Sequence, residues 1–438
     1  MATGTVTTQA ENYLRALVED LAIGEARYEQ AERSYQSLAE WLSRPESTLL
    51  RYSPQVYVQG SFRLGTVIRP PSEAEDYDVD AVCELRSLGT RSLSQQELKQ
   101  RLETEVRSYH HSKSMTKPVR EGRRCWVLDY ADGAQFHMDI VPCVPNAERM
   151  RLLLESRGET SPWSGTAVAI TDNERSNYPV VHEDWCRSNP KGYAGWFRQR
   201  MIVALTRRKQ NLAESTRSPV ESIPDYRVRT PLQSAIMLLK RHRDLRFEGR
   251  VKDRPISIIL STLAAHAYAA EESIGDALMS ILTGMDRFIE FEDGEYVIRN
   301  PTDPLENFAD KWKEFPERAV AFRDWLKQAR TDFSEAAALS DTRMIAESVA
   351  PSLGHPLAER AMRKVGATLL RSSSAAPAAA AAVTRTTPAA RRAARPGCRD
   401  CCRRHRPPKP PPAPLARQTS PAQAIAASRT PGTRRANP

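Results

Sequence analysis

The sequence predicts an α+β protein in which a mixed β-sheet packs against a helical C-terminal lobe. Three patterns predict this class: helical apolar spacing over residues 8–44, strand-like alternation over 55–145, and a return to helical spacing from about residue 190 onward. The chain before residue 372 is longer than one hydrophobic core usually grows, so two lobes are expected. We therefore predict domains at residues 1–190 and 191–371, followed by a tail at 372–438.

The first element is predicted to be one long helix over residues 8–44. The residues that form its apolar stripe are Tyr13, Leu14, Leu17, Leu21, Tyr35, Leu38 and Leu42. Such a stripe packs against a hydrophobic core. We expect this helix to brace the two lobes.

A turn at Gln59, Gly60 and Ser61 comes next and has the character of a phosphate-binding turn. Backbone amides around Gly60 and Ser61 can hold phosphate oxygens, and the Ser61 hydroxyl can donate a further hydrogen bond. Glycine also permits close backbone approach. A Gly-Ser turn alone is a weak motif, so its meaning depends on the residues after it.

The next strand begins with acids two residues apart. Side chains alternate faces along a strand, so Asp78 and Asp80 share one face and Val79 points to the other. Carboxylates this close favour a divalent cation, and Mg²⁺ prefers such ligands together with substrate phosphates. The combination predicts metal-dependent nucleotidyl transfer from nucleoside triphosphates. Asp76 lies on the same face, so spacing leaves the pairs Asp76–Asp78 and Asp78–Asp80 both open.

Residues 125–142 read as a β-hairpin closed by an Asp-Gly turn at 131–134. On its second strand Asp139 shares a face with His137. Two metal ions need more than two carboxylates, so Asp139 is the expected third ligand. His137 is expected to be a hydrogen-bonded structural histidine.

The C-terminal half is predicted to be mostly helical. The expected helices span residues 191–212, 230–245, 256–270, 273–290 and 304–331. Between residues 146 and 190 only loop signals are evident, so no regular structure is predicted there.

Taken together, these motifs resemble the bacterial cGAS/DncV-like nucleotidyltransferases (CD-NTases), which are related to oligoadenylate synthetase and cyclic GMP-AMP synthase. The likeness runs in family order from about residue 10 to 335. Its blocks are Gln59-Gly60-Ser61-Phe62, Asp78-Val79-Asp80, His137-Met138-Asp139-Ile140-Val141-Pro142, Asn189-Pro190-Lys191, Trp196-Phe197, Leu239-Lys240-Arg241-His242-Arg243-Asp244, Pro255-Ile256-Ser257-Ile258 and Asn307-Phe308-Ala309-Asp310-Lys311-Trp312.

The resemblance implies a polymerase-β-like nucleotidyltransferase core and an assignment of its metal ligands. Asp78, Asp80 and Asp139 match the catalytic acids that hold two Mg²⁺ ions, for which Mn²⁺ can substitute. Asp76 then lies outside the ligand set and is kept as the alternative.

Five further residues match nucleotide contacts of the family. They are Gln59, Gly60 and Ser61 in the turn and Lys240 and Ser257 in the helical lobe. The residues alone leave other roles open, because Lys240 lies in an arginine-rich helix where a solvated cation is common, and serine often caps a helix.

The activity implied by the resemblance is synthesis of a cyclic di- or oligonucleotide second messenger from NTPs, with release of pyrophosphate, in anti-phage (CBASS) defence. Its implied partners are an effector that senses the product and proteins that regulate or conjugate the enzyme. Two alternatives stay open: a nucleotidyltransferase that modifies tRNA or protein, and a catalytically silent nucleotide-binding module.

The charge of the chain is concentrated in its tail. Residues 372–438 hold twelve arginines and one lysine against the single acid Asp400, which exceeds the formal net charge of +10 of the whole chain. The rest is close to neutral, so no long nucleic acid is expected as a partner. The tail is rich in Ala, Pro and Arg without apolar periodicity, and we expect it to be disordered. Its abrupt onset after Arg371 resembles out-of-frame translation.

Cysteine usage indicates a reducing compartment. Four cysteines, Cys83, Cys125, Cys143 and Cys186, are scattered before the tail. The tail cluster of Cys398, Cys401, Cys402 and His405 has metal-like spacing but lacks a small fold around it, so we interpret it as accidental. No signal peptide and no membrane-spanning apolar run are evident. Together with the cysteine usage this predicts a cytoplasmic protein, and the resemblance implies a bacterial one.

Overall fold

The computed structural model describes residues 6–70, 76–130, 136–217, 219–220 and 228–374. The chain divides into a compact unit over Met1–Ala376 and a second unit over Pro377–Pro438. The predicted turn at 131–134 and the cysteine cluster in the tail lie outside the described residues, as does the predicted tail from residue 375 onward.

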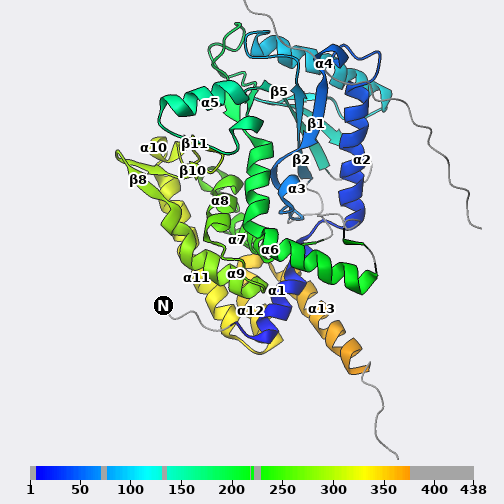
Figure 1. Ribbon diagram of the computed structural model, residues 1–438. Coiled ribbons are helices and arrows are strands. Elements are labelled where there is room, and N and C mark those ends of the chain that lie inside the picture. The colour runs from blue at the N-terminus through cyan, green and yellow to red at the C-terminus, as the bar shows by residue number, and fades with distance from the viewer. Residues whose placement is uncertain (1–5, 71–75, 131–135, 218, 221–227, 375–438) are drawn as a thin grey trace, which may run out of the picture. The chain divides into compact units, whose positions relative to one another are not determined.

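A seven-stranded mixed sheet forms one half of the first unit (Figure 1). Its strands follow the order β1-β2-β5-β4-β3, and β6 and β7 continue from β5. Strands β2 and β5 are parallel, whereas the other pairs are antiparallel. The strands are β1 (Pro54–Val58), β2 (Tyr77–Leu85), β3 (Arg120–Glu121), β4 (Trp126–Tyr130), β5 (Phe136–Pro145), β6 (Val168–Ile170) and β7 (Cys186–Ser188). The predicted pairing of β4 with β5 is confirmed.

Helices cover one face of this sheet and fill the other half of the unit. Their bounds are α1 (Thr8–Leu21), α2 (Glu25–Leu42), α3 (Gly60–Leu64), α4 (Gln95–Ser112), α5 (Ala147–Ser156), α6 (Pro190–Thr216), α7 (Pro231–Arg246), α8 (Ser257–Ala267), α9 (Ile274–Gly284), α10 (Lys311–Glu314), α11 (Glu317–Ala338), α12 (Thr342–Leu353) and α13 (His355–Ser374). The predicted α+β class, with a mixed sheet and a helical lobe, is confirmed.

The two faces of the sheet have different environments. On one face, Val79 and every second residue of β2 pack with Met138 of β5. Apolar residues of α2 and α4, such as Leu38 and Leu102, complete the same core. We call this the sheet core. The opposite face carries Asp78 and the other acids, and only its far end is apolar. One face is thus free for chemistry because the helices on the other supply the hydrophobic stabilisation.

A second core, the helical core, is built around α7. This helix is buried at every position from Pro231 to Arg243, as expected for a helix surrounded by others. Thr230 and Gln233 form a capping box at its start, and Pro231 occupies the first turn, where its missing N–H costs nothing. The sequence therefore specifies where the central helix of this core begins. The boundary between domains at residue 190 stays a prediction.

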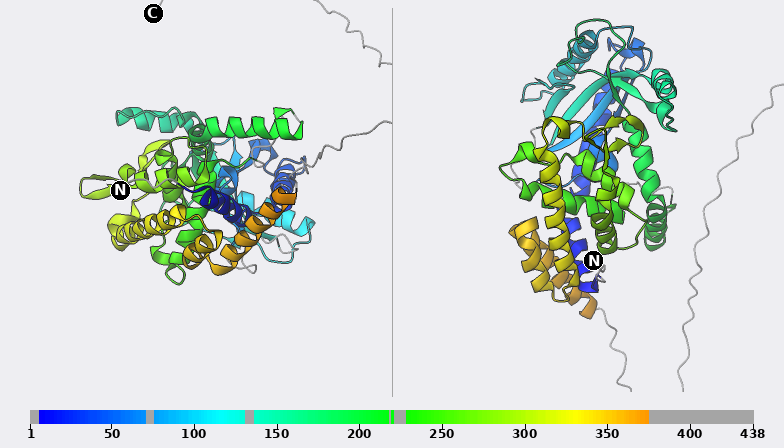
Figure 2. Two further views of the ribbon diagram at one scale, coloured as in Figure 1. Left: turned by 90° about the horizontal axis from the view of Figure 1, so that it is seen from below. Right: turned by 90° about the vertical axis from the view of Figure 1, so that its left-hand side faces the viewer.

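The predicted single helix over 8–44 is wrong in one respect, because the chain breaks between Leu21 and Glu25. Ala22 and Gly24 both have extended ψ values, 142° and 153°. Helix α1 belongs to the helical core and lies beside α13, whereas α2 belongs to the sheet core (Figure 2). The break lets one segment of sequence contribute to both cores, which a straight helix would not do.

Two other regions also differ from expectation. Residues 304–331 are not one helix: β10 (Arg299–Asn300) pairs with β11 (Asp303–Asn307), and α10 and α11 come after them. Pro316 occupies the N-cap position of α11 and lacks the N–H that a continuous helix would need. The sequence did not predict several other elements. They are the hairpin of β8 (Glu290–Glu292) and β9 (Glu295–Val297), helices α12 and α13, and the regular structure within 146–190.

Polar side-chain contacts join the helical core to the sheet. Lys191 at the start of α6 binds Glu84 of β2 at 2.7 Å and Gln55 of β1 at 2.8 Å. Gln233 of α7 donates to the carbonyl of Leu64 at 2.9 Å. The Lys191 contacts hold α6 against the sheet, and the Gln233 contact holds α7 against the segment that carries Ser61. Among the described residues, no helix combines the length and apolar character needed to cross a membrane.

We predict an acid-sensitive contribution to stability from Asp172, which is fully buried. Burial alone would raise its pKa, but hydrogen bonds from Arg123, from the Glu174 amide and from Arg124 hold the pKa well below the usual range. A lowered pKa stabilises the fold above the unfolded value of about 4, and this stabilisation is lost as pH falls below it. Asp172→Asn should lower the free energy of unfolding at pH 7 by about 1–3 kcal/mol.

The difference between the two proteins should shrink as the pH falls below about 4, where the unfolded carboxyl is protonated. Urea unfolding at a series of pH values measures it. A difference that stays constant down to the lowest pH would contradict the assignment.

Candidate active site

The parallel pairing of β2 with β5 brings the predicted acids together. In this register Asp78 lies opposite His137, and Asp80 lies opposite Asp139. Because partners in a register point to the same face, all four side chains project from the free face of the sheet. We call this the acidic face. Sequence alternation predicted which residues share a face on each strand, and the pairing of the strands brings the two sets side by side.

Gly60 lies directly against Asp80. The backbone N–H of Gln59 donates a hydrogen bond to the backbone carbonyl of Asp80 at 2.8 Å, which anchors the turn to β2. A Cβ added to Gly60 would lie 2.1 Å from Oδ2 of Asp80, and Gly60 has a φ of +61°. Both the close approach and the left-handed backbone require glycine here. The predicted turn and the predicted acids therefore form one unit.

The acidic face accumulates negative charge that the protein alone does not neutralise. Burial, together with the neighbouring charges of Asp139 and Asp78, raises the pKa of Asp80 to about 6. Burial also raises the pKa of Asp139. Oδ1 of Asp139 is buried and has no hydrogen-bond partner among the described residues. Since an unpaired buried carboxylate oxygen is costly, these residues fit a bound divalent cation.

His137 is engaged by Asp78, as a structural histidine would be. Its Nε2 lies 2.9 Å from Oδ1 of Asp78, and this contact raises the pKa of His137 although burial opposes it. The predicted hydrogen-bonded role is confirmed. The contact also holds the Asp78 carboxyl, which is 65% exposed, at the rim of the acidic face.

A second group of possible ligands was only partly foreseen. Ligand atoms of Asp76, Asp129 and His137 all lie within 4.8 Å of one another. Asp76 lies 3.7 Å from Lys117, and Asp129 accepts two hydrogen bonds from Arg120 at 3.1 Å. Cations of the protein therefore already balance these carboxylates. The signal for Asp129 is the hairpin register, since it lies opposite His137 on β4.

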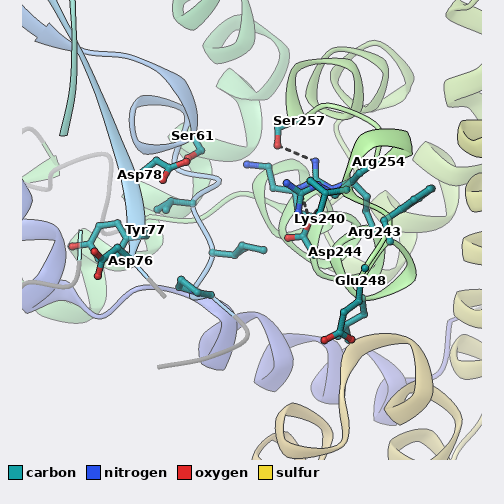
Figure 3. A pocket seen from close by; sticks show the side chains of 17 residues that line it. Ser61, Asp76, Tyr77, Asp78, Lys240, Arg243, Asp244, Glu248, Arg254 and Ser257 are labelled. Carbon is teal, nitrogen blue, oxygen red and sulfur yellow. Dashed lines mark hydrogen bonds and ion pairs between the residues drawn. The ribbon is translucent and has the colours of Figure 1, made fainter. Parts of the chain in front are cut away.

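A cavity of about 370 Å³ opens beside the acidic face (Figure 3). Five candidate residues line it: Ser61, Asp78, Lys240 and Ser257, together with Asp76, the alternative metal ligand. Figure 3 shows Ser61 and Asp78 on the side of the sheet, and Lys240 and Ser257 on the side of the helical core. The lining does not include Gln59, Gly60, Asp80 and Asp139. Gln59 and Gly60 contact Asp80, which lies beside Asp139 in the sheet.

Lys240 is not a solvated cation, so that alternative is wrong. It is 5% exposed, and its Nζ donates to the Thr66 carbonyl at 3.0 Å. Burial, reinforced by Arg243, lowers the pKa of Lys240 to about 7. An anion in the cavity would favour its charged form.

Ser257 begins α8 but does not cap it. The cap position is Ile256, and no side-chain hydrogen bond caps this helix. The Ser257 hydroxyl instead accepts a hydrogen bond from Nη1 of Arg243 at 2.9 Å. Arg243 thereby fixes the hydroxyl at the cavity wall, where its own proton is available to a ligand oxygen.

The arrangement suits binding of a polyphosphate with a divalent cation. Acids at one side of the cavity can hold the cation, and hydroxyl and cationic groups on the other can hold phosphate oxygens. In-line displacement at a phosphorus atom is catalysed by such positioning and charge neutralisation.

We predict that Gly60→Ala lowers stability by more than the strain of its left-handed backbone alone accounts for. Gly158 is the matched control, because it also has a positive φ, +71°, but no atom within 4 Å of an added Cβ. Both alanine variants should lose about 1 kcal/mol of stability from the left-handed backbone. Gly60→Ala should lose a further ~1–3 kcal/mol and weaken Mn²⁺ binding, because the new methyl group displaces Asp80. Urea unfolding and Mn²⁺ titration measure these effects, and equal losses in the two variants would contradict the contact.

Known proteins share this sequence pattern. Residues 9–177 match the model of the Second Messenger Oligonucleotide or Dinucleotide Synthetase (SMODS) domain. A c-di-GMP synthase of Roseivirga ehrenbergii is 28% identical over 339 residues, which cover 76% of this chain and 81% of that protein. The cyclic dinucleotide synthase CdnG of Bradyrhizobium diazoefficiens is 27% identical over 314 residues, 69% of this chain and 70% of that protein.

Solved structures share the fold. CdnG of Bradyrhizobium diazoefficiens in complex with GTP matches with a TM-score of 0.60 at 21% identity, over 82% of this chain and 99% of that one. The apo form of DncV from Vibrio cholerae matches with a TM-score of 0.54 at 12% identity, over 80% and 97% of the two chains. Residues 9–177 thus match the SMODS domain, and the order of the motifs and these matches agree with the predicted resemblance of the chain to the bacterial cGAS/DncV-like nucleotidyltransferases.

Proposed function

We propose that this protein joins nucleoside triphosphates into a cyclic di- or oligonucleotide and releases pyrophosphate at each step. One observation carries the proposal. Asp80 and Asp139 face each other across parallel strands, with a buried carboxylate oxygen that has no partner among the described residues, beside a cavity lined by Ser61 and Lys240. The names of the related synthases support the same activity.

Each residue of the site has a proposed role. Asp78, Asp80 and Asp139 are the proposed ligands of two divalent cations, Mg²⁺ with Mn²⁺ as a substitute. When bound, these ions would neutralise phosphate charge and favour deprotonation of the attacking ribose hydroxyl. Asp76 is the alternative ligand, but the close contact between Gly60 and Asp80 supports the pair Asp78 and Asp80.

The triphosphate is proposed to lie in the cavity. Ser61 donates to it from the turn, and Lys240 and Ser257 donate from the helical core. Gly60 allows the turn to approach Asp80. The backbone N–H of Gln59 holds the turn by its hydrogen bond to the Asp80 carbonyl. The protein thereby orients the leaving pyrophosphate relative to the acids, which is where most of the rate enhancement arises.

Guanosine triphosphate is the proposed substrate to test before the others. The related proteins are a c-di-GMP synthase and a synthase solved in complex with GTP. The proposed biological setting is anti-phage defence in the cytoplasm, with an effector that senses the product and regulatory or conjugating partners.

We predict that the purified protein, given all four NTPs and Mg²⁺ without any macromolecule, makes a product that resists phosphatase. A cyclic product has no terminal phosphate to remove. Mass spectrometry identifies its bases and ring size. Label that appears only on added tRNA or protein would instead favour the acceptor-modifying transferase, and nucleotide binding without turnover would favour the silent module.

We predict that Asp78→Asn combined with Asp80→Asn abolishes Mg²⁺-dependent pyrophosphate release. The pair is proposed to hold the ions, and an amide carries no charge to replace a carboxylate. The matched control is Asp324→Asn on α11, an exposed acid away from the cavity, which should release pyrophosphate at the wild-type rate. Undiminished release by the double variant would overturn the assignment of the ligands.

A further inference from the structure

Three cations line the cavity: Lys240, Arg243 and Arg254. They differ in how many of their hydrogen-bond donors the protein already uses. Arg243 is the most engaged. Its Nε and Nη2 donate to Oδ1 of Asp244 at 2.9 and 2.7 Å, and its Nη1 donates to the Pro255 carbonyl and to Ser257. Only 7% of its side chain is exposed. Arg243 therefore supports the wall of the cavity and has little left for a ligand.

Arg254 has the opposite character. Its side chain is 38% exposed, and within the described part of the chain it makes a single hydrogen bond, from Nη1 to Oδ1 of Asp244 at 3.4 Å. A guanidinium carries five N–H donors in a planar fork. Four of them thus remain available beside the cavity. The 3.4 Å contact with Asp244 positions the Arg254 guanidinium but occupies only one of its donors.

The charges around Arg254 favour an anion. Asp244 faces both Arg243 and Arg254, so one carboxylate balances two guanidinium groups. Lys240 and the exposed Glu248 line the same wall, so its three cations outnumber its two acids, Asp244 and Glu248. The cavity-lining acids proposed or kept as metal ligands, Asp78 and Asp76, lie at the sheet side of the cavity. A ligand that bridges the two sides is therefore anionic at the end that reaches Arg254.

We propose that Arg254 binds the terminal phosphate of the bound nucleotide and lets the site distinguish triphosphates from shorter nucleotides. This inference rests on the proposed function, because it takes the cavity to be the triphosphate site. The Arg254 fork donates two parallel hydrogen bonds to phosphate oxygens, a geometry that lysine does not offer. Asp244 is the positioning residue that holds the fork at the wall before the nucleotide arrives.

The experiment compares equilibrium binding of two probes by calorimetry in the presence of Mg²⁺. One is the α,β-methylene analogue of GTP, which cannot release pyrophosphate, and the other is GMP. Arg254→Ala should raise the Kd of the triphosphate analogue about 10- to 30-fold, as expected for loss of charge-assisted hydrogen bonds, and change that of GMP less than about twofold. Arg254→Lys should recover part of the loss.

The matched control is Lys252→Ala. Lys252 is exposed, two residues from Arg254, and does not line the cavity, so this variant loses the same charge near the site without changing the cavity wall. Its affinity should equal that of the wild type. Arg254→Gln, which keeps most of the side-chain length, provides the same comparison if the alanine variant fails to fold, and melting temperature checks folding in every case.

The outcomes separate this inference from the function beneath it. If the wild type binds the triphosphate analogue and Arg254→Ala binds it equally well, the role of Arg254 is overturned and the proposed function stands. An equal loss of affinity for the analogue and GMP would also overturn it, because the terminal phosphate would not be what Arg254 recognises. If the wild type binds no triphosphate at all, the proposed function falls, and this inference with it.

Discussion

The site depends on the parallel pairing of two strands, β2 and β5. Only in this register does Asp80 lie opposite Asp139, on a face that helices leave free. The sheet core on the other face, where α2 and α4 pack, holds both strands in place. Burial raises the pKa of Asp80, and repulsion from the neighbouring acids Asp139 and Asp78 raises it further. The hydrophobic packing of one face thus sustains an electrostatically unfavourable arrangement on the other.

The turn at Gly60 ties that arrangement to substrate binding. Its backbone lies against the Asp80 carboxyl, so the proposed phosphate contact at Ser61 and the proposed metal ligand move as one unit. On the far side, Gln233 holds the carbonyl of Leu64 and Lys240 holds that of Thr66. The turn is therefore anchored from both cores. Such anchoring on two sides is what keeps donors and acids at fixed separations during phosphoryl transfer.

The wall opposite the acids is organised around one carboxylate. Asp244 contacts two arginines, of which Arg243 is nearly saturated with contacts to the protein and Arg254 is not. The guanidinium group of Arg243 thus supports the cavity wall, whereas that of Arg254 is available to bind a ligand. The difference arises from burial, because the buried guanidinium must satisfy its donors within the protein, whereas the partly exposed one can leave them to solvent or to a ligand.

The sequence by itself determined the local features. Alternation predicted which acids share a face, the Asp-Gly hairpin placed Asp139, and apolar periodicity predicted a helix over 230–245, because each of these depends on neighbours along the chain. It did not predict the break at Ala22–Gly24, since that break serves two cores that are far apart in sequence. Only the tertiary structure decided that Gly60 contacts Asp80, that Asp129 joins His137, and that Lys240 is buried while Arg254 is not. Contacts and burial depend on which segments, distant in sequence, pack together in the fold. The spacing of residues along the chain does not predict that packing.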